Sequence, residues 1–473
     1  MTTITPPTST HSLRDRIVGI DQVVPLLDGR RVPYVNLDNA ASTPSFVDVW
    51  QAIEHFLPYY SSVHRGTGFK SRLSTVAYDQ AHEIIGRFVS ADLTNNTVIF
   101  GKNTTEAINK LAYRYPFKDG DVVLTTQMEH HSNDLPWRQH VHVVHVRATP
   151  EGRMDEADFD RQLERYAGRV ALVAVTGASN VSGFCSLSIA WPAKPMRPGP
   201  ISGRLRPTGS PSPGGYAAGR RSGTPGFCHP LRPQDVRAVW HRCACRPKAI
   251  FEQGPPEYRG GGTVDIVTLD DVHWAGAPDR DEAGSPNVVG AVAMAVAAQV
   301  LMDVGMDTVA AHEEELIAYS LNALKQVPGI RIYGETDPGR VHEKVGVIPF
   351  NLEGVSHFLL SAILGYEGGI GVRSGCFVPT PMLSICWRWM NSRPEAGATR
   401  CWTVTGQRCP AWSGPALAVT TTLMMWIVWS RCFNGSPPVS IRASTFWTAH
   451  PVNTPRPTTG SRWPTFSCLT RMS

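Results

Sequence analysis

The feature that most constrains the fold is an alternation of apolar β-branched runs with helical patterns. Val122–Gln127 and Arg169–Ser179 are apolar runs that end in polar residues, as parallel strands buried on both faces do. A helical pattern over Met154–Gly168 lies between them, the small-residue run Asn287–Met306 predicts a buried helix, and a further strand is expected over Lys344–Leu352. This alternation predicts an α/β fold with a mainly parallel sheet, whose functional residues follow the carboxyl ends of strands.

Two stretches, 185–248 and 378–473, differ in composition from the rest of the 473-residue chain. They hold nine of the ten cysteines, ten of the 13 tryptophans and 20 of the 45 Lys and Arg residues, but only two of the 40 acids. The formal charge of +5 comes from these stretches and does not by itself indicate an acidic partner. Because 191–226 is rich in Pro, Gly and Arg, it is typical of a linker, and a solvated basic insertion is favoured over a nucleic-acid-binding segment.

Signals for localisation, metal and membrane are weak. The N-terminus lacks the apolar segment of a secretory signal, so a cytoplasmic protein is expected. Cys243 and Cys245 are separated by one residue, which is not the usual zinc spacing, and no metal site is expected. The uncharged run Ala411–Trp429 is nearly long enough to span a bilayer. Its first half is small and polar, and no membrane partner is expected.

One polar cluster begins a helix after an expected strand. Asn103 is the expected N-cap of this helix, and Glu106, three residues later, completes a capping box. Backbone N–H groups at such a helix end, together with the hydroxyls of Thr104 and Thr105, are suited to a phosphate. A simple helix cap has the same pattern.

Two more polar clusters follow the apolar runs. His130 and His131 come directly after the run that begins at Val122, and they suit stacking on or bonding to a planar ligand. Adjacent histidines on a surface loop usually have no such role. Asn180 follows the next run, and a third residue at a strand end favours a site between these loops.

Eight short motifs follow one another along 34–184 and 249–376. They are YVNLDNAASTP, VHRGTG, GKNTTEAIN, QMEHHSNDLPW, ASNVSG, YRGGGTVDIVT, DEAGSPN and GVRSGC. In this order they resemble the cysteine desulfurases of the class V aminotransferase family, which use pyridoxal 5'-phosphate. The resemblance implies the PLP-dependent transferase fold type I, with a large domain built on a mainly parallel sheet and a smaller α/β domain. It also implies a homodimer that converts L-cysteine to L-alanine and transfers the sulfur to an enzyme cysteine, with a sulfur-acceptor protein as a further partner in iron–sulfur cluster assembly.

The resemblance assigns the cofactor contacts residue by residue. His130 stacks on the pyridine ring, Asn180 bonds the ring hydroxyl, and Thr104 and Thr105 hold the phosphate. Thr263 reaches the phosphate of the cofactor in the other subunit.

It also assigns the substrate contacts. Arg373 holds the substrate carboxylate, because its planar fork suits a bidentate contact. Asn39 and His64 line the substrate pocket.

The catalytic residues of the family are missing from the chain as written. The family has a VDxAQ motif and then a SGHK motif, whose lysine forms the Schiff base, between its ASN and GGG motifs, whereas this chain has only Lys194 and Lys248 there, in other contexts. Read one base later, 231–246 can give SGHKMYAPFGTGALVG, with the lysine codon across Gln234 and Asp235. In the same frame 203–213 can give VDCAQLAPHRP. From Phe377, FVPTP can give CAHPY, with the cysteine codon across Phe377 and Val378.

Frameshifts in 185–248 and after Phe377 therefore explain both odd stretches, as a sequencing error or in a pseudogene. The predicted organisation is an N-terminal segment of the small domain over 1–33, a large domain over 34–290, a small domain over 291–377 and an out-of-frame tail over 378–473. The chain as written is expected to be inactive. The alternatives are another class V aminotransferase or a selenocysteine lyase, and a non-enzymatic basic binding protein.

Overall fold

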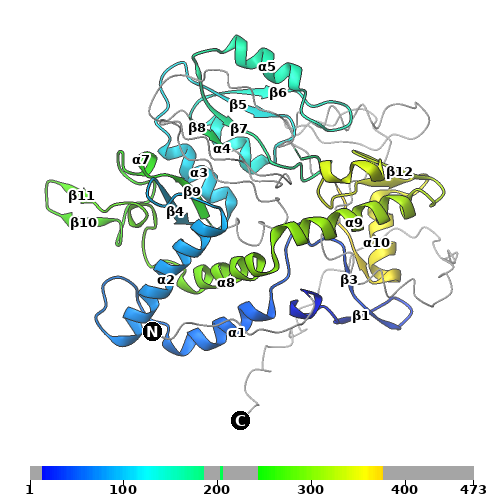
Figure 1. Cartoon of the computed structure of the whole chain (residues 1–473), viewed down its shortest axis with the longest axis horizontal. Coiled ribbons are helices and arrows are strands. Elements are labelled where there is room, and N and C mark those ends of the chain that lie inside the picture. Colours follow the sequence, from blue (N-terminus) through cyan, green and yellow to red (C-terminus); the bar gives the residue numbers. More distant parts are fainter. Residues whose placement is uncertain (1–12, 186–202, 206–242, 376–473) are drawn as a thin grey trace, which may run out of the picture. The chain divides into compact units, whose positions relative to one another are not determined.

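The structure is a computed structural model that describes residues 13–185, 203–205 and 243–375, with the backbone alone for 203–205 and 243–247 (Figure 1). All described residues belong to one compact unit. The predicted split between 34–290 and 291–377 stays a prediction.

The described α-helices alternate with strands through most of the chain. They are α1 (Val47–Phe56), α2 (Phe69–Phe88), α3 (Thr104–Arg114), α4 (Leu135–Arg138), α5 (Glu156–Arg165), α7 (Lys248–Phe251), α8 (Val288–Val304), α9 (Met306–Leu324) and α10 (His357–Gly368).

The strands are short, and six sheets form among the described residues. They are β1 (Val23–Pro25), β2 (Arg31–Pro33), β3 (Val35–Asn36), β4 (Asn96–Phe100), β5 (Val122–Thr126), β6 (His142–Val146), β7 (Val170–Ala174), β8 (Gly203–Leu205), β9 (Cys243–Pro247), β10 (Val264–Val267), β11 (Val272–Trp274), β12 (Ile330–Ile332), β13 (Phe350–Leu352) and β14 (Ile370–Gly371).

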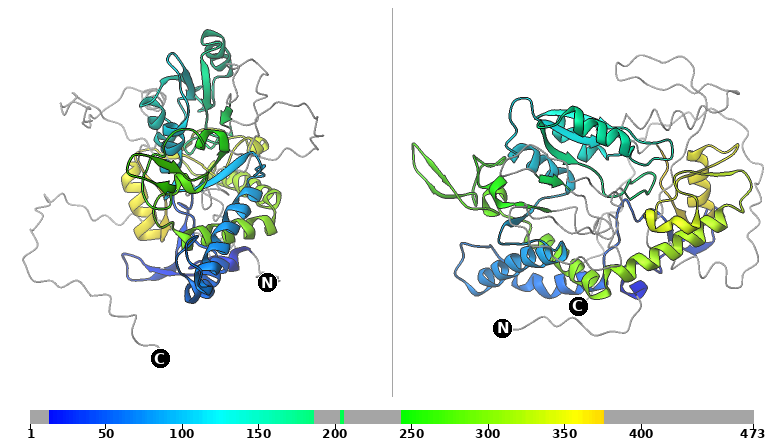
Figure 2. Two further views of the ribbon diagram at one scale, coloured as in Figure 1. Left: turned by 90° about the vertical axis from the view of Figure 1, so that its left-hand side faces the viewer. Right: turned by 45° about the horizontal axis from the view of Figure 1, so that its top comes forward.

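The largest sheet has the order β6-β5-β7-β8, and all of its strands are parallel. Helices cover both of its faces. Val122 and Leu124 of β5 pack in one cluster with Phe159 of α5, whereas Val123 packs in another with residues of α3 and α4. Two further views show α5 beside these strands (Figure 2). Coverage on both sides explains why every residue of β5 and β7 is buried, and why β7 and the first three residues of β5 are apolar.

Smaller sheets join segments that are distant in sequence. β4 pairs antiparallel with β9, and β14 pairs parallel with β3. β12 and β13 form one antiparallel pair, β10 and β11 form a second, and β1 and β2 form a third. The β3–β14 pair places residues near both ends of the described chain side by side.

α8 packs against α1 and α2 through small and apolar side chains, and most of its residues are buried. Gly305 follows α8 in the left-handed region, with φ of 84°, and α9 begins after it. Within the described part, no single helix has the length and apolar character needed to cross a membrane. α8 and α9 meet that test only as a pair, bent by 76°.

Most sequence predictions of elements are confirmed. β5, β7, α5 and α8 lie within the ranges expected for them, and the α/β class with a parallel sheet is confirmed. The strand expected over Lys344–Leu352 is wrong in extent, because only Phe350–Leu352 is a strand. Lys344 forms only an isolated antiparallel bridge with Phe184, which includes the hydrogen bond from Val345 N to Gly183 O. Gly346 N then donates to the Glu313 side chain, and Pro349 has no N–H to donate.

Candidate active site

The amino end of α3 forms one part of the site. Asn103 Oδ1 accepts a hydrogen bond from Glu106 N at 2.9 Å, so the predicted N-cap is confirmed. The Glu106 carboxylate reaches back to Lys102 N at 2.5 Å, one residue before the cap. Thr104 is the first residue of the helix. Because the first-turn N–H groups of a helix have no intrahelical acceptor, this end can bind a phosphate.

Ser132 connects this helix end to the histidine loop. Thr105 Oγ1 lies 2.8 Å from Ser132 Oγ, which lies 3.1 Å from His130 Nδ1. Ser132 N donates to the same ring nitrogen at 3.2 Å. A backbone N–H always donates, so His130 Nδ1 is an acceptor and a neutral His130 carries its proton on Nε2. His130 and His131 are both exposed.

Glu129 lies beneath this loop and is fully buried. It accepts hydrogen bonds from Thr126, Asn133 and Thr176. Neither Glu129 nor Ser132 follows from the sequence pattern as a site residue. The one signal is an acidic residue three positions after a fully buried strand, where burial without partners is costly.

Asn180 lies half-buried in a turn after β7. Ser179 Oγ accepts hydrogen bonds from Val181 N at 3.2 Å and Ser182 N at 3.1 Å, which fixes the turn locally. Ser182 Oγ donates to Gly152 O at 2.8 Å. The loop that carries Asn180 is therefore held on both sides by hydrogen bonds to its neighbours.

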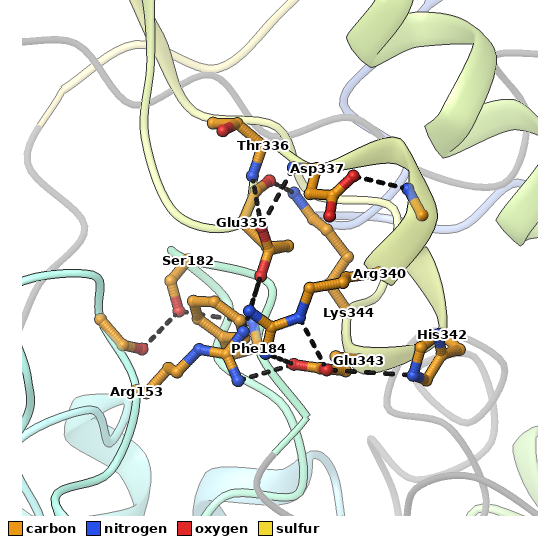
Figure 3. A network of polar contacts seen from close by, with 12 residues as sticks. Arg153, Ser182, Phe184, Glu335, Thr336, Asp337, Arg340, His342, Glu343 and Lys344 are labelled. Carbon is orange, nitrogen blue, oxygen red and sulfur yellow. Dashed lines mark hydrogen bonds and ion pairs between the residues drawn. The ribbon is translucent and has the colours of Figure 1, made fainter.

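Ion pairs of Arg153, in the turn before α5, connect that turn to the segment before β13 (Figure 3). The Arg153 guanidinium lies 2.7 Å from a Glu335 oxygen and 2.6 Å from a Glu343 oxygen. It also stacks on the Phe184 ring at 3.9 Å. Lys344 is buried beside this cluster, and its Nζ donates to Glu335 O at 3.3 Å.

Arg373 and Asn39 come together where β14 pairs with β3. Arg373 Nε and Nη2 each donate to the Asp38 carboxylate at 2.9 Å, and this hydrogen bond raises the pKa of Arg373. Asn39 is buried, and its Nδ2 donates to Asn36 O at 3.1 Å. Within the described residues, Asn39 Oδ1 has no hydrogen-bond partner.

His64 and Thr263 lie on two loops that touch. His64 has a φ of 64°, and its Nε2 lies 3.3 Å from Asp79 Oδ1. The Thr263 hydroxyl is buried and donates to Gly260 O at 2.7 Å. Arg65 Nη2 donates to Val264 O at 3.4 Å and so joins the two loops.

The glutamate of the DEAGSPN motif supports these loops. Glu282 accepts hydrogen bonds from Phe100 N at 2.5 Å, from His82 Nε2 at 3.1 Å and from the Tyr78 hydroxyl. Burial raises the pKa of Tyr78, and the charge of Glu282 raises it further. This buried carboxylate therefore fastens α2 to the end of β4, directly before the turn that leads into α3.

The structure thus brings the predicted residues together in pairs. Thr105 meets His130 through Ser132, and Arg373 is bonded to the residue before Asn39. Asn180 is joined to the loop of His130 through the Glu129 side chain. Several predicted positions lie outside the described residues: Lys194, Gln234, Asp235, Cys376, Phe377 and Val378. Lys248 is described; it begins α7, and its N–H donates to Asn95 O at 3.0 Å.

The model of the aminotransferase class-V family matches residues 35–188 and 244–387. A cysteine desulfurase of Haloferax volcanii is 31% identical over 382 residues, which are 75% of this chain and 83% of that protein. The chain belongs to the class-V aminotransferase family. A probable cysteine desulfurase of Halalkalibacterium halodurans is 29% identical over 400 residues, covering 80% of this chain and 92% of the relative. The predicted family is confirmed.

Solved structures of similar fold include other cysteine desulfurases. The apo enzyme from Thermococcus onnurineus NA1 aligns with a TM-score of 0.58 at 20% identity, covering 82% of this chain and 89% of that one. CsdA from Escherichia coli aligns with a TM-score of 0.58 at 22% identity, covering 79% and 90%. These likenesses confirm the fold predicted from the class-V resemblance.

The described residues of this class-V member fit pyridoxal 5'-phosphate at several points. The amino end of α3 with two threonine hydroxyls suits the phosphate, and His130 is accessible at the same edge of the sheet. The buried Asn39 Oδ1, which has no partner in the described part of the chain, offers a polar contact. Across the described ranges, no group of three His, Cys, Asp or Glu side chains is arranged to hold a metal ion.

Proposed function

We propose that this chain carries the cofactor-binding scaffold of a pyridoxal-phosphate-dependent cysteine desulfurase. The similarity to the Haloferax volcanii cysteine desulfurase over 382 residues carries the proposal. The contacts from Thr105 through Ser132 to His130 support it, because they join a helix end suited to phosphate to the side chain expected on the ring. The substrate is L-cysteine, which an intact enzyme of this kind converts to L-alanine.

Each part of the site has a distinct task in this proposal. Pyridoxal phosphate, when bound, supplies an electron sink for bond cleavage next to the substrate amine. Thr104 and Thr105 hold its phosphate, His130 covers the ring, and Asn180 bonds the ring hydroxyl.

Arg373 binds the substrate carboxylate, while Asn39 and His64 line the pocket around the substrate. The two hydrogen bonds that Arg373 makes to Asp38 hold its side chain beside Asn39, and a guanidinium is the group that binds a carboxylate through two parallel hydrogen bonds.

The polypeptide as written does not carry out desulfuration in this proposal, because it lacks the lysine of SGHK and the cysteine of CAHP. Frameshifts over 185–248 and after Phe377 explain both losses. The family match supports this reading, since it omits 189–243 and ends at 387. The backbones of β8 and β9 also support it, because the alternative frame reads VDC at β8 and ALVG along β9.

The intact enzyme is a cytoplasmic homodimer in this proposal. The β10–β11 hairpin next to Thr263 supports a second copy as partner. Its side chains Ile266, Val267 and Leu269 are at least 59% exposed, and apolar surface of this kind usually marks an interface. A sulfur-acceptor protein takes the sulfur onward.

The experiment compares the chain as written with a version whose reading frame is restored over 185–248 and from Phe377. Both are titrated with pyridoxal phosphate and then given L-cysteine, with alanine as the product measured. We expect both to bind the cofactor, and only the restored version to form alanine. Alanine formation by the chain as written would refute its inactivity, and no cofactor binding by either version would refute the scaffold.

A matched control separates this activity from the related lyase activity. L-Selenocysteine in competition with L-cysteine, using the restored version, tests the substrate. Exclusive use of L-selenocysteine would overturn the assignment of L-cysteine. A His130→Ala variant of the restored version should bind the cofactor more weakly, by about tenfold, through loss of stacking.

A further inference from the structure

A fully buried carboxyl group lies beneath the predicted ring-binding loop. Glu129 is 0% exposed and directly precedes His130. Its Oε1 accepts hydrogen bonds from Thr126 Oγ1 and from Thr176 N, both at 2.7 Å. Its Oε2 accepts one from Asn133 Nδ2 at 2.7 Å. Three short bonds to one carboxylate are of the strong, charge-assisted kind.

The three donors belong to three different segments. Thr126 ends β5, Asn133 ends the short helix η3 (His131–Asn133), and Thr176 lies two residues beyond β7 and four before Asn180. The Glu129 side chain therefore connects three places: the end of β5, the turn at η3 that follows β5, and the segment just after the adjacent parallel strand β7. Thr176 donates through its backbone N–H, and this donor cannot be reversed or replaced by rotating a side chain.

We propose that Glu129 is a positioning residue whose carboxylate holds the turn carrying His130 against the loop carrying Asn180. The inference rests on the proposed function in one respect: the roles of His130 and Asn180 in binding the cofactor. The coupling between the two loops rests on the hydrogen bonds alone, so the two ideas can fail separately.

The protonation state of Glu129 changes this coupling. Burial raises the pKa of the Glu129 carboxyl to about 7, although the bonds from Asn133, Thr176 and Thr126 lower it, and the charge of Asp134 raises it further. Asp134 itself is paired with Arg138 and His145. When Glu129 gains a proton, its O–H can donate to the Thr126 hydroxyl, which rotates to accept it. The bonds from Thr176 N and Asn133 Nδ2 then go to a neutral carboxyl group and lose their charge assistance. The coupling is therefore tighter above neutral pH than below it.

Two substitutions and one control test the inference in the full chain. Glu129→Ala removes all three contacts, and Glu129→Gln keeps the shape but fixes the group in a neutral state. Asp134→Asn is the matched control, because Asp134 is also buried and lies five residues later. Its bonds go to Arg138 and His145 and not to the Asn180 loop.

The first measurement is hydrogen–deuterium exchange of the segments 127–138 and 175–185 at pH 6 and pH 8, corrected for intrinsic rates. Loss of buried hydrogen bonds to a charge should raise exchange in both segments by about tenfold in Glu129→Ala. Glu129→Gln should abolish the pH dependence seen in the unmodified chain. At pH 8, Asp134→Asn should raise exchange only in 127–138, because it leaves the three hydrogen bonds to Glu129 in place. Increased exchange in one segment alone for Glu129→Ala, or an unchanged pH dependence in Glu129→Gln, would overturn the inference.

The second measurement is the affinity and visible absorbance of added pyridoxal phosphate between pH 6 and pH 9. Glu129→Ala should weaken binding by about tenfold. The affinity should change less with pH in Glu129→Gln than in the unmodified chain, whereas the absorbance change of the cofactor's own groups remains. Cofactor binding by the unmodified chain with no change in either variant would refute the positioning role. If the unmodified chain binds no cofactor, the proposed function fails, and the exchange data alone decide whether Glu129 couples the two loops.

Discussion

Replacing Lys344 by methionine should make the folded chain more stable at neutral pH. Lys344 is 1% exposed, and its Nζ makes one hydrogen bond, to Glu335 O at 3.3 Å, among the described residues (Figure 3). Burial lowers the pKa of this amine from 10.5 to about 8, and the nearby Glu335, Cys185 and Glu313 limit the fall. The folded state therefore holds an ammonium group at pH 7 in surroundings that disfavour it.

The size of the effect follows from the lowered pKa. A fall from 10.5 to about 8 corresponds to about 3 kcal/mol of folding free energy. Because the pKa is lower in the folded state, the unfolded state binds more protons between pH 8 and 10.5. Stability therefore rises with pH across that window, and the cost is complete below pH 8. Methionine has a similar volume and removes this cost, but it leaves Glu335 O without its donor, which costs about 1 kcal/mol.

The expected net gain for Lys344→Met is about 2 kcal/mol at pH 7, falling to zero or slightly below by pH 10.5. Urea unfolding at pH 7, 8.5 and 10.5, followed by tryptophan fluorescence, measures it. Lys325→Met is the matched control, because Lys325 is exposed, and its effect should stay within about 0.5 kcal/mol at every pH. A loss of stability at pH 7, or a difference between Lys344→Met and the unmodified chain that does not change with pH, would refute the reasoning.

Three further changes have defined outcomes in the same unfolding assay. Arg153→Ala removes two ion pairs and the stacking on a phenylalanine ring, and it should lower the free energy of unfolding by about 1–2 kcal/mol. Arg147→Ala is its control: that side chain is mostly exposed, and the loss should be under about 0.5 kcal/mol. Leu124→Ala should cost about 2–5 kcal/mol because Leu124 is fully buried, while Leu135→Ala, at a half-exposed site, should cost little. Burial disfavours the charged form of His82, but Glu282 raises its pKa above 6.5 overall. The folding free energy that the His82–Glu282 pair contributes is fully present below pH 6.5 and is lost as the pH rises through the raised pKa of His82. His82→Gln should therefore cost about 1 kcal/mol at pH 6 and close to nothing at pH 9.

The sequence predicts local structure at this site better than long-range contacts. The cap at Asn103 is correct because capping depends on residues three positions apart. The predictions of β5 and β7 are correct because strands covered on both faces are built from runs of mainly apolar residues. The strand predicted over Lys344–Leu352 is interrupted after a single bridge to Phe184, because the side chain of Glu313, far away in sequence, takes the N–H of Gly346.

The composition of the site is harder to predict than its location. His130 and Asn180 follow apolar runs, so their place at one edge of the sheet is expected. Ser132 and Glu129 act through side-chain hydrogen bonds that depend on loop geometry, which no spacing rule encodes. The Arg373–Asp38 pair joins residues 335 positions apart, and only the pairing of β3 with β14 creates it.

That pair has a consequence for the order in which a ribosome completes the molecule. Asp38 and the turn at Thr104 leave the ribosome early, whereas Arg373 appears only after most of the chain has been made. Because folding proceeds from the amino end during synthesis, the end of the site proposed for the phosphate assembles first, and the end proposed for the substrate carboxylate assembles last. A message that stops before the codon of residue 373, or that changes frame and does not return to it before that codon, yields a product with the proposed phosphate end and without Arg373.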